Sequence, residues 1–260
     1  LGRSFSVPIW DGRVVPGLKL WVHAEQGFGD TLQFCRYVRL LKAQGIHVSF
    51  ECADPLRDLM QSAGADTVIA PGEEPDVDAH VPMMSLPGLF GTAVETIPAS
   101  VPYLSAPADR MQAWQETMAA WPDGRRIGIA WKGAASHQRD ALRSPGLAPF
   151  LALLDVPDVV LVSLQKEDGA ADIQNTPGAD AILDPTADIN DFADTAAIMQ
   201  GLDAVISCDS APLHLAGSMG MPTYAVLPHV AEWRWGAGGD QTPWYPTMTL
   251  IRQPAPGDWV

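Results

Sequence analysis

Short hydrophobic runs alternate with segments of helical periodicity along most of the chain. The runs 18–23 and 159–164 have the length and apolar composition of buried strands. Elsewhere hydrophobic residues recur every three or four positions, as at Phe192, Ala196 and Met199, which is the spacing of one helix face. Strands that alternate with helices predict parallel sheets covered by helices, an α/β fold.

The pattern predicts two α/β halves joined near residues 105–125. We expect strands at 18–23, 46–52, 67–70, 79–82, 126–131, 159–164, 204–207 and 223–227. We expect helices at 30–44, 55–63, 109–121 and 211–220, and one that is capped by Asn190 or Asp191 and reaches Leu202.

Composition excludes several classes of protein. Hydrophobic residues make up 47% and charged residues 18% of the 260 residues, so the chain can bury a core and does not resemble a disordered protein. Sixteen Lys and Arg against 31 Asp and Glu give a net charge of −15, which argues against a nucleic-acid partner. No hydrophobic run reaches the ~18 residues of a membrane span.

The three cysteines predict the compartment. Cys35, Cys52 and Cys208 lie far apart and form no CxxC pair, so we expect buried thiols rather than disulfides or a zinc site. This usage favours a reducing compartment, here the cytoplasm. The chain shows neither a signal peptide nor an initiator Met, and we expect it to be a piece of a longer protein.

The first polar motif, H-A-E-Q-G-F-G-D-T-L, follows the first strand and opens a helix. Ligands of α/β folds bind at the carboxyl ends of the strands. Gly27 and Gly29 would let the backbone approach a ligand or adopt positive φ. Asp30 has two interpretations: a general base for an incoming hydroxyl group, or a helix N-cap.

A dinucleotide fingerprint is another interpretation of this turn. Glu51, near the end of the second strand, would be its acidic residue. However, Leu32 occupies the place of the third glycine, and Glu25 and Asp30 bring negative charge to a turn that would hold a pyrophosphate.

The second motif, S-C-D-S-A-P-L-H, also joins a strand to a helix. Asp209, Ser210 and the free N–H groups of the first turn suit an anion, because a helix N-terminus carries partial positive charge. His214 lies one turn after Ser210 on the same face. The alternative is that His214 is a core histidine and that Asp209 and Ser210 are caps.

Two further polar segments follow predicted strands. Lys132 lies in W-K-G, and Gln165 and Lys166 lie in S-L-Q-K-E. The lysines could bind a phosphate, or they could belong to solvated loops. Because all four motifs follow strands, two facing halves would place them around one cleft suited to a phosphorylated sugar or nucleotide.

A cluster of aromatic residues near the end of the chain has two interpretations as well. Trp233, Trp235, Trp244 and Tyr245 could stack on a base or a sugar, or they could form an interdomain core patch.

The order of these motifs resembles a known family. E-Q-G-F-G-D-T-L-Q-F-C-R-Y, S-L-P-G-L-F-G-T, W-K-G, V-S-L-Q-K, D-F-A-D-T-A-A, D-S-A-P-L-H-L-A-G and W-R-W…P-W-Y-P stand in sequence from about residue 5 to 259. They resemble the glycosyltransferase domain that follows tetratricopeptide repeats in bacterial proteins. That domain is similar to the ADP-heptose:lipopolysaccharide heptosyltransferase family.

The resemblance implies a GT-B fold, with two Rossmann-like domains facing across a cleft. These would be an acceptor-side domain at 1–107, a linker with a helix at 108–125 and a nucleotide-sugar-binding domain at 126–260. It implies that Asp30 is the general base and that Asp209, Ser210 and His214 form the donor-phosphate motif. Lys132, Gln165 and Lys166 would face the donor diphosphate.

The implied activity is a metal-independent, inverting transfer of a sugar from a nucleotide-diphosphate donor to a hydroxyl group of a saccharide or protein, with no cofactor. The alternative is a non-catalytic nucleotide-sugar-binding or interaction module attached to tetratricopeptide repeats. A dehydrogenase remains a third hypothesis. The net charge of −15 counts against a phosphorylated lipopolysaccharide acceptor.

Overall fold

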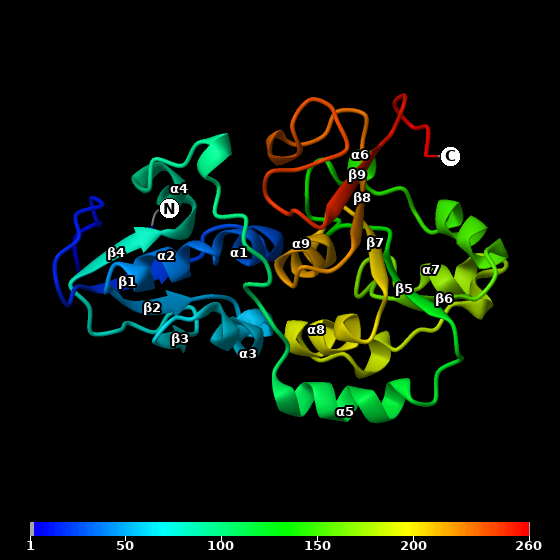
Figure 1. Ribbon diagram of the computed structural model, residues 1–260, viewed down its shortest axis with the longest axis horizontal. Helices are drawn as coiled ribbons and strands as arrows, with labels where there is room; N and C mark the ends of the chain where they lie inside the picture. The colour runs from blue at the N-terminus through cyan, green and yellow to red at the C-terminus, as the bar shows by residue number, and fades with distance from the viewer. Residues whose placement is uncertain (1–2, 260) are drawn as a thin grey trace.

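The computed structural model describes residues 3–259 and consists of two lobes, each built on a parallel sheet (Figure 1). The N-terminal sheet has the order β3-β2-β1-β4, and the C-terminal sheet has the order β6-β5-β7-β8-β9. The strands are β1 Lys19–His23, β2 His47–Glu51, β3 Thr67–Ile69, β4 Ala79–Pro82, β5 Arg125–Ala130, β6 Val159–Ser163, β7 Ala204–Cys208, β8 Thr223–Leu227 and β9 Met248–Arg252.

All eight predicted strands form, within two residues of their expected ends. The ninth strand, β9, was not predicted. It pairs in parallel with β8 at the edge of the C-terminal sheet. Ile251 of this strand faces solvent, and the charged Arg252 is its last residue. A short edge strand of this kind lacks the fully apolar pattern of a buried strand.

The helices are short and often interrupted. The α-helices are α1 Phe28–Phe34, α2 Tyr37–Ala43, α3 Arg57–Met60, α4 Leu86–Leu89, α5 Ala108–Met118, α6 Asp140–Arg143, α7 Asp172–Asn175, α8 Phe192–Gln200 and α9 Ala211–Ser218. The 3₁₀ turns are η1 Asp54–Leu56, η2 Gln61–Ala63, η3 Met83–Ser85, η4 Val94–Thr96, η5 Ala148–Asp155, η6 Ala179–Ala181, η7 Thr186–Asp188 and η8 Trp233–Trp235.

The prediction of one continuous helix at 30–44 is wrong, because α1 ends before α2 begins. The Leu32 carbonyl accepts a hydrogen bond of 2.9 Å from the Tyr103 hydroxyl, and the Gln33 carbonyl accepts one of 2.7 Å from Arg36 Nε. These side chains take carbonyls that a continuing helix would bond to its own N–H groups. The helix predicted at 55–63 is likewise divided, into η1, α3 and η2.

The linker helix α5 packs against α8 of the C-terminal lobe. Arg110 forms ion pairs with Asp191 at 3.2 Å and with Asp194 at 3.0 Å, and Trp114 donates to Asp194. Asp191 is the N-cap of α8, as predicted, and accepts hydrogen bonds from two N–H groups of its first turn.

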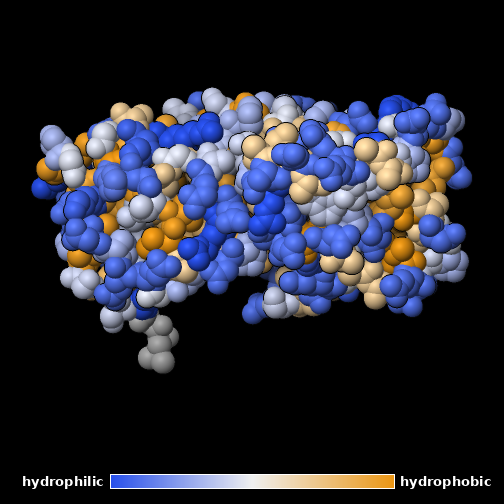
Figure 2. All heavy atoms as spheres, turned by 90° about the horizontal axis from the view of Figure 1, so that it is seen from below, coloured by the Kyte–Doolittle hydropathy of each residue, from blue (hydrophilic) through white to orange (hydrophobic). Residues whose placement is uncertain are grey.

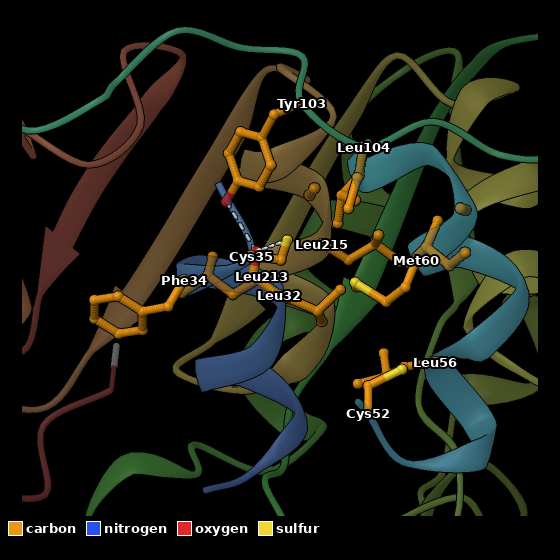
Figure 3. Packing of buried hydrophobic residues seen from close by; sticks show 14 of the residues in the cluster. Leu32, Phe34, Cys35, Cys52, Leu56, Met60, Tyr103, Leu104, Leu213 and Leu215 are labelled. Atoms are coloured by element: carbon orange, nitrogen blue, oxygen red, sulfur yellow. Dashed lines mark hydrogen bonds between the residues drawn. The ribbon is translucent and has the colours of Figure 1, made fainter. Parts of the chain in front are cut away.

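One hydrophobic core extends through both lobes. Leu32 and Phe34 of α1 lie in the same buried cluster as Leu213 and Leu215 of α9 (Figure 3). The buried guanidinium of Arg36 also joins the lobes, because it donates to the Trp244 carbonyl at 2.7 Å. The shared core therefore holds the two sheets in one arrangement.

All three cysteines are free and buried, as predicted. Among residues 3–259, no helix has the length and hydrophobicity that crossing a membrane requires. The face seen from below carries mostly hydrophilic side chains, with small hydrophobic areas between them (Figure 2).

Candidate functional site

A cleft of about 790 Å³ lies between the two halves. Every residue that the sequence assigned to the site lines this cleft: Gly27, Gly29, Asp30, Lys132, Gln165, Lys166, Asp209, Ser210 and His214. The prediction that the polar motifs converge on one cleft is therefore confirmed.

The parallel sheets explain this convergence. Asp30 follows β1 across a short loop, Lys132 follows β5, Gln165 follows β6, and Asp209 directly follows β7. Parallel strands end at the same edge of a sheet, so the loops that follow them meet there.

Asp30 is the third residue of α1, and Gly27 occupies the N-cap position. The interpretation of Asp30 as an N-cap is therefore wrong. Its Oδ1 atom instead accepts a hydrogen bond of 2.8 Å from Arg234 Nη2, with both side chains largely buried. Sequence reasoning missed Arg234, although it is the cation within the W-R-W motif.

The two glycines have different roles, and neither adopts a positive φ, so that part of their interpretation is wrong. A Cβ atom on Gly29 would lie only 2.8 Å from Cδ2 of His214. Gly29 therefore lets α1 contact α9 closely. A Cβ atom on Gly27 would meet only Oδ2 of Asp30, at 3.7 Å.

His214 is a buried core histidine, as one of its two interpretations predicts, and it also contacts residues of the site. The ring is 2% exposed, its Nδ1 lies 2.9 Å from the Tyr245 hydroxyl, and its Nε2 lies 3.7 Å from Oδ1 of Asp209. Burial lowers the pKa of His214, although the nearby Asp209 carboxylate opposes the shift. Burial thus favours the neutral form of this ring.

Asp209 is a buried carboxylate that the protein itself satisfies. Its Oδ2 atom accepts a hydrogen bond of 2.9 Å from Trp235 Nε1. Burial tends to raise the pKa of Asp209, but His214, Trp235 and the charge of Arg234 together bring the pKa below its usual value. Asp209 thus orders the turn before α9 rather than facing an anion directly.

Ser210 occupies the N-cap position of α9, but its side chain makes no capping hydrogen bond. Its hydroxyl lies 3.2 Å from the Cys208 carbonyl. Pro212 has no N–H, and Leu213 N–H donates to the Ser210 carbonyl. Within the described part of the chain, the N–H groups of Ser210 and Ala211 have no acceptor, so this turn can bind an anion.

The predicted cations differ in availability. Among the described residues, the Lys132 ammonium has no hydrogen-bond or ion-pair partner, whereas the Lys166 ammonium donates to the Ile189 carbonyl. Arg139 and Arg143 also line the cleft, where Arg143 is paired with Asp140 at 3.2 Å. Lys132 and Arg139, on the C-terminal side of the cleft, can therefore stabilise a diphosphate.

The Gln165 side chain forms hydrogen bonds with the backbone of two loops that border the cleft. Its Oε1 accepts from the N–H groups of Trp131 and Lys132 at 3.0 and 2.9 Å, and its Nε2 donates to the Asp168 carbonyl at 2.7 Å. Its amide is thus occupied by the two loops that carry Lys132 and Lys166, so Gln165 positions these loops.

The structure argues against the dinucleotide-binding interpretation, because its acidic residue, Glu51, is not available to a ligand. Both carboxylate oxygens of Glu51 are occupied, one by Arg3 at 2.5 Å and the other by Trp21 Nε1 at 3.0 Å. Glu51 is buried and is therefore unavailable to a ribose hydroxyl.

The aromatic cluster divides into two parts. Trp235, Trp244 and Tyr245 are buried, so the core interpretation is correct for them. Trp233 is 62% exposed and lines the cleft, where its ring is available to a ligand.

Comparison with known proteins supports the fold. No family model matches the chain. The chain is 24% identical to protein FlbA of Caulobacter vibrioides over 310 aligned positions, which cover 98% of this chain and 47% of FlbA. It therefore spans about half the length of that curated relative.

Solved structures match both halves together. The Escherichia coli ADP-heptose lipopolysaccharide heptosyltransferase II matches with a TM-score of 0.64 at 12% identity, over 90% of each chain. A family 9 glycosyltransferase from Veillonella parvula matches with a TM-score of 0.66 at 12% identity, over 92% of this chain and 88% of the other. The fold is therefore GT-B-like, as predicted.

Proposed function

We propose that the protein is a metal-independent, inverting glycosyltransferase that moves a sugar from a nucleotide-diphosphate donor to an acceptor hydroxyl group. The observation that supports this most is the placement of Asp30 and the anion-binding turn at Ser210 in one cleft. Solved structures with the same fold include heptosyltransferases, one of them described with ADP-2-deoxy-2-fluoro heptose.

The C-terminal wall would hold the donor diphosphate. The N–H groups of Ser210 and Ala211 and the Lys132 ammonium, which has no partner in the described part of the chain, would neutralise the charge that develops on the leaving diphosphate. Donors arranged in advance like these typically contribute about 3–4 kcal/mol each to the transition state. They would take the place of a metal ion.

Asp30 would act as the general base. Arg234 holds Oδ1, and no described residue hydrogen-bonds to Oδ2, so this oxygen can take the proton of the acceptor hydroxyl. The hydroxyl oxygen then bonds to the anomeric carbon while the bond from that carbon to the diphosphate oxygen breaks. The nucleoside diphosphate leaves from the opposite face, which inverts the configuration.

Replacing Asp30 with Asn tests the proposal, because Asn keeps the shape and removes the base. We expect Asp30→Asn to bind ADP, GDP or UDP as the parent does in calorimetry, and to lose transfer by about 10²–10⁴-fold. Transfer at the parent rate would exclude Asp30 as the base.

The same measurement separates the alternative function. If the parent binds a nucleotide but neither transfers nor hydrolyses any tested nucleotide sugar, the chain is a binding module. The ion pair that occupies one oxygen of Asp30 is the observation that favours this alternative. If the parent binds none of the three nucleotides, the glycosyltransferase proposal is wrong.

A further inference from the structure

An exposed tryptophan lies beside the proposed base. The Trp233 ring centre is 5.4 Å from the guanidinium carbon of Arg234, and that guanidinium donates to Asp30 at 2.8 Å. A large hydrophobic side chain that is 62% exposed in a cleft costs solvation free energy unless a ligand covers it. The location therefore indicates a binding surface next to Asp30.

Other exposed hydrophobic residues border the same cleft. Phe28 belongs to the N-terminal half and is 38% exposed, while Val230 belongs to the C-terminal half and is 66% exposed. The hydrophobic surface therefore comes from both halves and borders the space where an acceptor would meet a donor.

The charges in the cleft are divided unevenly. Among the residues that the structure describes, the lining residues of the N-terminal half include no Lys, Arg or His; they are Gln26, Gly27, Phe28, Gly29, Asp30, Pro55 and Met84. Lys132 and Arg139 line the C-terminal wall, in and after the loop that follows β5. The N-terminal wall of the cleft therefore contributes no described cation, and the cation beside Asp30, Arg234, comes from the C-terminal half and is paired with carboxylates.

Close to Trp233 the balance of charge is negative. Arg234 lies between two carboxylates, Asp30 at 2.8 Å and Glu232 at 3.2 Å. An anionic group beside Trp233 would meet like charge, which disfavours binding. A group with hydroxyls would instead find acceptors in these carboxylates and in the Gln26 amide.

We propose that this end of the cleft is the acceptor subsite and that it takes an uncharged saccharide. The apolar face of the sugar ring would lie on Trp233, and its hydroxyls would donate to Glu232, Gln26 and Asp30. This inference rests on the proposed function and narrows it, because it excludes phosphorylated saccharides as acceptors.

Ligand-observed NMR on the full chain, with and without saturating ADP, tests the inference without any turnover. The probes are the methyl β-glycosides of glucose, galactose and N-acetylglucosamine, with glucose 6-phosphate as the charged counterpart. We expect the parent to bind at least one methyl glycoside, and to bind glucose 6-phosphate about tenfold more weakly or not at all.

Two variants locate the subsite, and one is a control. Trp233→Ala should weaken glycoside binding about tenfold and leave ADP binding unchanged. Tyr224→Ala, which removes an aromatic side chain that is 41% exposed and outside the cleft, should change neither. Gln26→Lys adds a cation at an exposed lining position and should improve the binding of glucose 6-phosphate.

Three results would overturn the inference: no glycoside binds, glucose 6-phosphate binds the parent as well as the glycosides do, or Trp233→Ala loses ADP affinity. The last would make Trp233 a platform for the nucleobase. Each result differs from a failure of the proposed function, which would appear as an absence of nucleotide binding or transfer in the parent.

Discussion

Lys132 and Lys166 follow neighbouring strands of the same sheet and line the same cleft, yet within residues 3–259 only the Lys132 ammonium lacks a partner. The ammonium of Lys166 is bonded to a backbone carbonyl, whereas that of Lys132 has no partner among the described residues. Both lysines follow a predicted strand in a polar segment, so the sequence does not distinguish them. At the scale of the residue, the surroundings of a side chain thus decide its role.

This difference predicts unequal effects of two matched substitutions. Lys132→Ala should weaken the binding of a nucleoside diphosphate by about 10–100-fold, because a charge-assisted hydrogen bond contributes about 1.5–3 kcal/mol. Lys166→Ala should have a much smaller effect. Calorimetry with ADP, GDP and UDP measures both, and equal losses for the two variants would contradict the assignment.

At the scale of the element, the break between α1 and α2 shows how a distant side chain can end a helix. The Tyr103 hydroxyl donates to the Leu32 carbonyl and accepts from Nη2 of Arg36 at 2.8 Å (Figure 3 shows the bond to Leu32). Arg36 in turn holds the C-terminal lobe through the Trp244 carbonyl. The position of α1, and hence of Asp30, depends on this buried network.

Removing one hydroxyl group tests the network. Tyr103→Phe leaves a buried carbonyl and a buried guanidinium N–H without a partner, so the free energy of unfolding should fall by about 1–3 kcal/mol. Tyr224→Phe is the control, because that side chain is half-exposed. Urea denaturation measures both variants, and equal stabilities would show that the hydroxyl is dispensable.

At the scale of the whole molecule, a glycine lies at one of the places where the two halves pack closely together. Gly29 lies on α1, and the His214 ring it faces is held by the Tyr245 hydroxyl at 2.9 Å and stacks on Trp235. The ring has little room to move away from a new methyl group. Gly29 therefore permits the close contact between α1 and α9 beside the cleft.

Two alanine substitutions test this contact. Gly29→Ala should lower the free energy of unfolding by about 1–3 kcal/mol, because overpacking outweighs the gain in helix propensity. In Gly27→Ala the new Cβ atom would meet only Oδ2 of Asp30, at 3.7 Å, so the free energy of unfolding should change by about 1 kcal/mol or less. Thermal unfolding compares the two variants, and a Gly29→Ala protein as stable as the parent would show that the contact with His214 accommodates a methyl group without cost.

Charge is distributed unevenly over the whole molecule, as it is within the cleft. The chain carries −15, yet Lys132, Arg139 and Arg143 face one wall of the cleft. A local group of cations can attract a diphosphate although the rest of the surface is acidic, because salt screens charges beyond about 10 Å.

The sequence by itself determined eight of the nine described strands, their parallel direction and the position of each polar motif after a strand. These depend on local hydrophobic periodicity and on the rule that parallel strands end at one edge. Asp30, Lys132 and Ser210 could therefore be predicted to share a cleft.

Only the tertiary structure decided which of these side chains are available and what they contact. Arg234 binds Asp30 from 204 positions away, Gln165 is occupied by backbone groups, and Trp233 is exposed while Trp235 is buried. Such contacts join residues far apart in the chain. They depend on how the elements pack, which local periodicity does not determine.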